Sequence, residues 1–262
     1  MLERHCSFPI LFTAAAVFLT IVPATAQNLT PIQDAITAGV MATPDPVVQS
    51  TAPINVVPFE FDPFGTNLVS ANWLSGIGCP TNATANSGPP SNTSSPVSDL
   101  GCPTSDPQDG GNQGLFLVKT GPTTNYAAAG AKLVGPGAKG ILLTELGYDL
   151  RKSVSAITPN GSHCGAGAPR FNIVTSDGVT HFIGCNSPPA VMTDSSNSWI
   201  RLRWTSPGSV AFPPFAPTVT VSSLSIIFDE GTDTGPDFFG AAILDNIDVN
   251  GTLVGSGPTG GK

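Results

Sequence analysis

The clearest pattern of hydrophobic and polar residues in this chain has a period of two. Residues 199–204 read Trp-Ile-Arg-Leu-Arg-Trp, so Ile200, Leu202 and Trp204 face one side and the residues between them face the other. Such alternation is typical of a β-strand with one face on a core. Further short β-rich runs predict strands at residues 54–61, 68–74, 115–118, 132–134, 140–146, 170–175, 179–184, 219–228 and 241–249.

Turn residues separate these runs. The chain has 29 glycines and 26 prolines, which is high but below the level that implies disorder. Ser176-Asp177-Gly178, between two β-rich runs, indicates a hairpin. No amphipathic helix stands out. The pattern therefore predicts an all-β fold, a two-layer antiparallel β-sandwich of the jelly-roll type.

The N-terminus is typical of a secretory signal. The basic pair Arg4 and His5 precedes the apolar residues 10–22, and Ala24-Thr25-Ala26 fits a cleavage site. We expect residues 1–26 to be a signal peptide, 27–53 a proline-rich leader or linker, and 54–262 a single β-sandwich domain. We expect secretion to the extracellular space, the periplasm or the cell surface. No later apolar run is long enough for a transmembrane segment.

Four cysteines remain after the expected cleavage: Cys79, Cys102, Cys164 and Cys185. An even number in an oxidising compartment favours disulfides, and the absence of a Cys-x-x-Cys motif argues against a zinc knuckle. We favour the local pairs Cys79–Cys102 and Cys164–Cys185, each stabilising by about 3 kcal/mol. The crossed pairings remain open.

Charge limits the partners of the chain. Only 11% of the residues are charged and the net charge is −8, so nucleic acid is not an expected partner. Residues 229–248 hold six acids, and no Lys or Arg lies between Arg203 and Lys262. Such oxygen-rich loops suit a structural Ca²⁺ ion. The candidate ligands are Asp229, Glu230, Asp233, Asp237 and Asp245.

Two alternatives to a calcium site remain open for these acids. One is a solvated acidic loop whose carboxylates cap turns. The other concerns Asp245, which follows an apolar run and is the kind of residue that accepts backbone N–H bonds.

The candidate ligand surface is the polar face of residues 199–204. Aromatic rings stack on sugar rings while polar neighbours bind the hydroxyls. Trp199, Arg201 and Arg203 would form such a platform, with a solvated strand face whose Trp packs under a loop as the alternative. Weaker aromatic candidates are Trp73, Tyr126 and Tyr148.

No catalytic motif is present. The chain lacks a Gly-x-Ser-x-Gly elbow and a His-Glu-x-x-His motif, and we expect His163 and His181 to be bystanders. Glycosidase chemistry needs two carboxylates, but nothing in the spacing of Glu145, Asp149 and the 229–248 acids singles out a pair.

Arg170 is a rare basic residue at the start of a predicted strand. We expect it to bind an internal carboxylate such as Asp149 or Asp177, with a ligand-facing role as the alternative.

Two segments resemble known families. His163 to Phe171, followed by Gly184-Cys185, resembles a Cys-Gly-x-Gly-x-Pro-Arg-Phe segment of uncharacterised secreted, mostly bacterial β-sandwich proteins. Ile243 to Gly251 resembles the closing strand of jelly-roll domains of the galactose-binding-like and carbohydrate-binding-module-like kinds. The first resemblance implies no activity. The second implies that Asp245 is a structural acid near a bound cation.

We therefore expect a secreted, non-catalytic β-sandwich that binds a polysaccharide or a cell-surface glycan, with calcium as its candidate structural ion. Two alternatives remain open: a secreted glycosidase-like hydrolase that uses carboxylates of residues 229–248, and a structural or adhesive extracellular protein with no small ligand.

Overall fold

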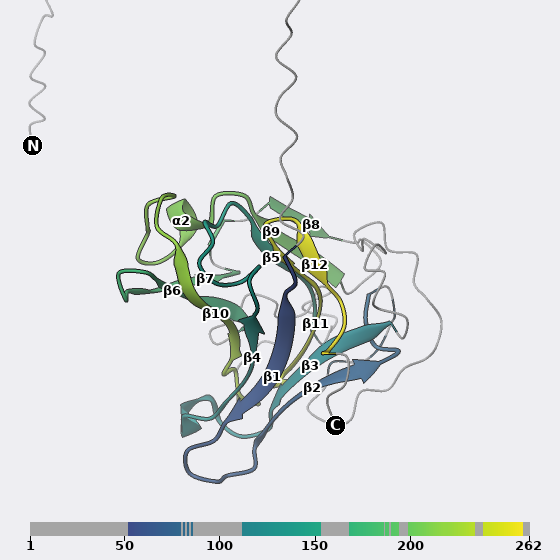
Figure 1. Ribbon diagram of the computed structural model, residues 1–262. Helices are drawn as coiled ribbons and strands as arrows, with labels where there is room; N and C mark the ends of the chain where they lie inside the picture. The colour runs from purple at the N-terminus through teal and green to yellow at the C-terminus, as the bar shows by residue number, and fades with distance from the viewer. Residues whose placement is uncertain are drawn as a thin grey trace, which may run out of the picture. The chain divides into compact units, whose positions relative to one another are not determined.

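The computed structural model describes residues 52–79, 81, 83, 85, 112–152, 168–185, 187–188, 190–193, 199–233 and 238–258. These residues form two antiparallel sheets (Figure 1). The five-stranded sheet, here sheet A, has the order β1 (Asn55–Phe61), β4 (Ala128–Val134), β10 (Val221–Phe228), β6 (Arg170–Thr175) and β7 (Thr180–Gly184).

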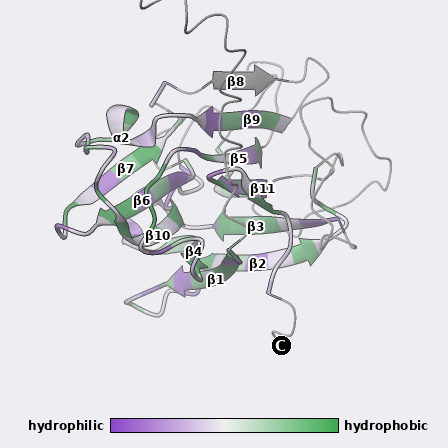
Figure 2. Ribbon diagram, turned by 45° about the horizontal axis from the view of Figure 1, so that its top comes forward, coloured by the Kyte–Doolittle hydropathy of each residue, from purple (hydrophilic) through white to green (hydrophobic). Residues whose placement is uncertain are grey.

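The seven-stranded sheet, here sheet B, has the order β2 (Val69–Ser75), β3 (Gln113–Lys119), β11 (Ala241–Val249), β5 (Leu146–Arg151), β9 (Trp199–Trp204) and β8 (Ala190–Thr193). The short β12 (Thr252–Val254) pairs with β11. Figure 2 shows β8, β9, β5, β11, β3 and β2 following one another in that order. The described helices are the 3₁₀ turn η1 (Thr123–Asn125) and α2 (Pro207–Val210), and no helix in this part of the chain is long and apolar enough to cross a membrane.

Strand order confirms the jelly-roll prediction. Within the two sheets, the path β3–β11–β5–β9 faces the path β4–β10–β6–β7. In chain order these strands pass back and forth between the sheets as two Greek keys, which defines a jelly-roll. The hairpin-like pair β1 and β2 extends one edge of each sheet, beside β4 and β3 respectively.

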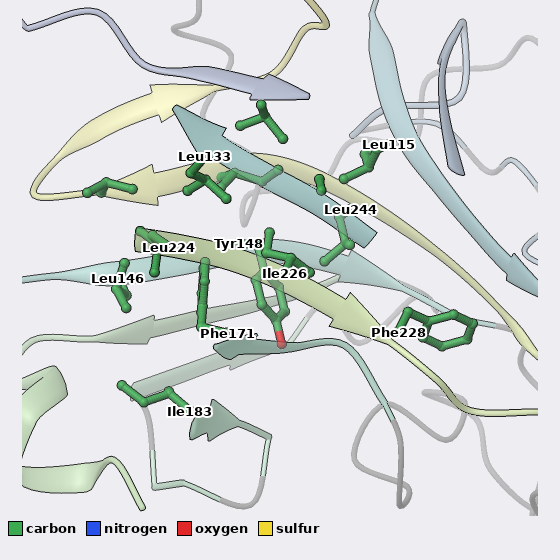
Figure 3. Close-up of a cluster of buried hydrophobic side chains, with 14 of the residues drawn as sticks. Leu115, Leu133, Leu146, Tyr148, Phe171, Ile183, Leu224, Ile226, Phe228 and Leu244 are labelled. Carbon is green, nitrogen blue, oxygen red and sulfur yellow. The ribbon is translucent and has the colours of Figure 1, made fainter. Parts of the chain in front are cut away.

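The core lies between the sheets and comes from the apolar side of each alternating pattern (Figure 3). Ile200, Leu202 and Trp204 all belong to it, as the sequence predicts. Tyr148 and Phe171 pack tilted with their ring centroids 5.4 Å apart. The Tyr148 hydroxyl donates to the Pro169 carbonyl, so this buried polar atom is satisfied.

Two strand boundaries differ from the prediction. Residues 140–146 are not a strand: Gly140 has a φ of +75°, Leu142 forms only an isolated bridge, and β5 begins at Leu146. These residues instead belong to the connection from β4 in sheet A to β5 in sheet B. β4 begins at Ala128 rather than at Lys132. The residues that the prediction missed are small, and at least one of them packs closely: a Cβ on Gly130 would lie 2.8 Å from Cζ of Phe59. The sequence pattern also did not predict the strands β8 and β12.

The register defines the two ends of the sandwich. Asn55 pairs with Val134 and Phe61 pairs with Ala128, so β1 and β4 both run the full distance between the ends. The described chain enters beside β1 at residues 52–54, at the same end as the 135–145 loop. The last described residues also lie away from the end of the sandwich where β1 finishes and β4 begins, since the Gly257 amide donates to the Gln113 side chain at the start of β3.

Candidate functional site

The outer face of sheet B carries the predicted Trp199, Arg201 and Arg203, but it is not an open platform. Trp199 is only 3% exposed, and its Nε1–H donates to the Thr81 carbonyl at 2.8 Å. It belongs to a second small apolar cluster that includes Ile77, Cys79, Ala83 and Ala85, which pack on this face. The predicted alternation is confirmed, and Trp199 fits the alternative reading, in which the tryptophan packs under a loop segment.

The two arginines are held by carboxylates of neighbouring strands. Arg201 contacts both oxygens of Asp149, at 3.0 and 3.2 Å. Arg203 lies 3.4 Å from Asp149 and 3.2 Å from Asp248. The Arg203 side chain crosses β5 at Gly147, where a Cβ would come within 2.4 Å of Arg203 Cδ. Both arginines bind carboxylates of the protein itself. Ligand binding by them stays a prediction.

Burial dominates the electrostatics of this network. It raises the pKa of Asp149 against the opposing effect of the two arginines. It raises the pKa of Asp248 to about 6 and lowers the pKa of Arg203. Perturbed carboxyls are a feature of catalytic sites. Here the two carboxyl side chains are 1% and 5% exposed and occupied by arginine, so they present no open cleft to a substrate.

The acids of residues 229–248 have separate protein partners. Asp229 accepts two 2.7 Å hydrogen bonds from Arg170, and Glu230 pairs with Lys152. Asp233 accepts from the amide and hydroxyl of Thr123. Arg170 does have an internal carboxylate partner, but the expected Asp149 or Asp177 is wrong, because the 229–231 loop lies beside the start of β6 and the spacing along the chain does not show it.

Asp245 behaves as a structural acid. Its Oδ2 accepts from the Cys79 amide at 2.7 Å and its Oδ1 from the Asn246 amide at 2.6 Å. Asp237 lies outside the described residues. Among the residues that the structure does describe, no three acidic, histidine or cysteine side chains gather as a metal site.

The remaining predicted residues are placed as follows. Cys79 is buried in the second cluster and Cys185 packs on the main core. Cys102 and Cys164 lie outside the described residues, as do His163 and most of the Cys-Gly-x-Gly segment, so the pairing stays a prediction. His181 is buried between Thr175 and Pro213, as a bystander would be.

Exposed aromatic side chains gather at one end of the sandwich, here called the aromatic end. They lie at the end of β1 and in three loops, namely residues 62–68, residues 120–127, and the described residues 229–233 and 238–240 between β10 and β11; the first loop lies at the bottom of Figure 1. Large apolar side chains that remain this exposed mark interaction surfaces. The side chains and their exposed fractions are Phe61 (53%), Phe64 (72%), Tyr126 (77%), Phe238 (62%) and Phe239 (39%). Two further exposed phenylalanines, Phe182 (37%) and Phe212 (77%), lie elsewhere, in β7 and bridged to it.

Hydrogen bonds fasten the three loops to one another. The Thr120 amide donates to the Leu68 carbonyl at 2.7 Å, which joins the first loop to the second. Asp233 accepts from Thr123, and the Thr232 amide donates to the Gly121 carbonyl, which joins the second loop to the third. The hydrogen bonds from Thr123 lower the pKa of Asp233, with the Thr123 amide as the largest cause. The exposed rings therefore sit on a preorganised base.

Two of the exposed rings are carried by strained backbone. Tyr126 has a φ of +58° and Phe238 a φ of +56°, in the left-handed region that bulky residues rarely adopt. Such a conformation costs about 1–3 kcal/mol and persists at functional sites. A glycine would remove the strain at either position, so an aromatic side chain there costs stability.

The aromatic end was only partly readable from the sequence. Tyr126 is a predicted candidate and is exposed as expected, whereas Trp73 is half-buried and Tyr148 fully buried. The phenylalanines were missed. Their signal is an aromatic residue inside turn-forming sequence, Asp-Pro-Phe-Gly at residues 62–65 and Asp-Phe-Phe-Gly at 237–240.

A scan against protein-family models finds no match, and neither does a comparison with curated proteins. Among solved structures, a family 11 carbohydrate-binding module of cellulosomal cellulase Lic26A-Cel5E from Clostridium thermocellum is similar, with 12% identity, a TM-score of 0.33, and coverage of 79% of this chain and 93% of that one. A family 11 module from the same organism in complex with a β-1,3-1,4-mixed-linked tetrasaccharide has 14% identity, a TM-score of 0.28, and coverage of 78% and 99%. These likenesses are too distant to transfer a function.

Proposed function

We propose that this protein is a secreted, non-catalytic jelly-roll domain that binds a polysaccharide or cell-surface glycan through its aromatic end. The observation that carries the proposal is the set of exposed rings on three mutually bonded loops, two of them held in strained backbone. Rings bind the apolar faces of sugars, and preorganised loops lower the entropy cost of binding.

The charges near the rings favour a glycan over an anionic membrane. Asp62 and Asp233 are on the same loops, and the chain has a net charge of −8. Lys119, the cation closest in sequence to η1, is buried and donates to the Thr123 carbonyl. Carboxylates accept hydrogen bonds from sugar hydroxyls, whereas they repel anionic lipid headgroups.

Removal of single rings should weaken glycan binding without unfolding the protein. Affinity electrophoresis in gels that contain β-glucan, xylan, mannan or starch would identify a polysaccharide that retards the wild type. Phe64→Ala should then weaken binding about tenfold, a loss of about 1.4 kcal/mol. Tyr126→Gly should weaken it similarly while raising the free energy of unfolding by up to about 1 kcal/mol, since the strained φ suits glycine.

The matched control is Phe182→Ala, on the edge strand β7 and away from the three loops. It should bind as the wild type does. Unchanged retardation of Phe64→Ala and Tyr126→Gly, or binding of the wild type to anionic vesicles rather than to any polysaccharide, would contradict the proposal.

Calcium binding by the 229–248 segment remains part of the proposal as a structural role. If it occurs, Ca²⁺ should raise the melting temperature relative to a sample with chelator, by mass action on the folded state. Equal melting temperatures in the two samples would contradict calcium binding by this segment.

A further inference from the structure

A groove lies at the end of the sandwich opposite the aromatic end, here called the end groove. Its volume is about 360 Å³, within the range of small-ligand sites. Four segments line it: residues 143–144 before β5, 205–206 after β9, α2, and residues 215–217 before β10. β4 alone spans seven residues between the two ends, a separation of about 20 Å. The end groove is therefore independent of the aromatic end.

The floor of the end groove is apolar and fixed in position. Phe215 is half-buried, with its ring against the backbone of Gly208, where a Cβ would lie 3.2 Å from two ring carbons. The ring of His181 also packs against the Phe215 ring, with the two ring centroids 4.8 Å apart. His181 is itself held by Thr175 and the Pro213 carbonyl. The Phe215 ring is thus preorganised to contact a flat apolar surface.

The rim of the end groove consists of hydroxyl groups and carries no charged side chain among its lining residues. The Ser209 hydroxyl donates to the Ser206 carbonyl, and the Thr144 hydroxyl donates to Asn250. Ser206 stands at the N-cap of α2, yet its hydroxyl makes no cap hydrogen bond. Since serine at this position ordinarily caps the helix, its hydroxyl is left able to bond a ligand.

We infer that the end groove is a second binding site, for a single neutral sugar ring. The ring's apolar face lies on Phe215, and its hydroxyls bond the Ser206 and Thr205 hydroxyls at the rim. The lining offers no charged side chain to pair with a sugar acid or an amino sugar, so charged sugars gain no charge-assisted hydrogen bond here and neutral sugars are the expected ligands.

Amide chemical-shift mapping tests this inference with single sugars as probes. Glucose, galactose, mannose, xylose and N-acetylglucosamine are titrated separately into the ¹⁵N-labelled full chain. At least one of them should shift the amides of Leu143, Gly208 and Ser209. Phe215→Ala should abolish these shifts, and Ser206→Ala should weaken binding about threefold to tenfold, as expected for one lost hydrogen bond.

Two further variants make the test independent of folding and of the aromatic end. Ser209→Trp, at an exposed position, should fill the groove and abolish the shifts even if Phe215→Ala fails to fold. Phe64→Ala should leave them unchanged, so loss of polysaccharide binding at the aromatic end and loss of sugar binding here are measured separately. Absence of groove shifts with every sugar, or their persistence in Ser209→Trp, would overturn the inference, as would shifts caused only by an apolar probe such as decanoate.

Discussion

Replacement of Lys152 by alanine is expected to lower the free energy of unfolding by about 3–5 kcal/mol. Lys152 follows β5 and pairs with Glu230 in the β10–β11 loop, and both side chains are 0% exposed. Its ammonium also lies 5.6 Å from the ring centroid of Phe228. Removing the lysine takes a positive charge away from the buried Glu230 carboxylate, and breaking a buried ion pair in this way is strongly destabilising.

Urea denaturation of the wild type and Lys152→Ala measures this loss. The matched control is the double variant Lys152→Met with Glu230→Leu, which removes both charges while keeping the volume filled. It should be far closer to the wild type than the single variant, because no unpaired charge remains. A single variant as stable as the double one would show that the pair is not buried as described.

Lowering the pH should raise the free energy of unfolding of the wild type relative to that of Asp248→Asn. Burial raises the pKa of Asp248 to about 6 in the folded protein, from an ordinary value of 3.8. The folded state therefore binds a proton more tightly than the unfolded chain, and the ionised carboxylate destabilises the fold at pH 7 by about 3 kcal/mol. This cost disappears as the pH falls through about 6 toward about 4.

The measured quantity is the free energy of unfolding of the wild type minus that of Asp248→Asn, at several pH values. It should be lowest near pH 7, rise as the pH falls, and level off once both states are protonated. Asp177→Asn gives a control of opposite sign, since the Thr175 hydroxyl lowers the pKa of Asp177 in the folded hairpin and its contribution is lost in acid. A difference for Asp248→Asn that does not change with pH would contradict the assigned burial.

The strand pattern was readable from the sequence because the core uses one face of each strand. The alternation at residues 199–204 and the Asp177-Gly178 hairpin both appear where they were predicted. The pattern could not show what lies on the outer face of sheet B. Residues 83 and 85 are alanines in a segment of Asn and Thr, and only packing shows that they cover Trp199.

Function was harder to read because ion pairs join segments distant in sequence. Arg170 and Asp229 are 59 positions apart, and Lys152 and Glu230 are 78 apart. Two acids that look uncompensated along the chain, Glu230 and Asp229, are therefore paired with Lys152 after β5 and with Arg170 of β6. The exposed phenylalanines were missed for the opposite reason, since an apolar residue is expected to be buried until a structure shows it in a loop.

The two ends of the described chain lie away from the aromatic end. The described residues begin beside Asn55 and finish near Gln113, both away from the loops that carry Phe64 and Tyr126. Neither end of the described range therefore lies beside the exposed rings of the aromatic end.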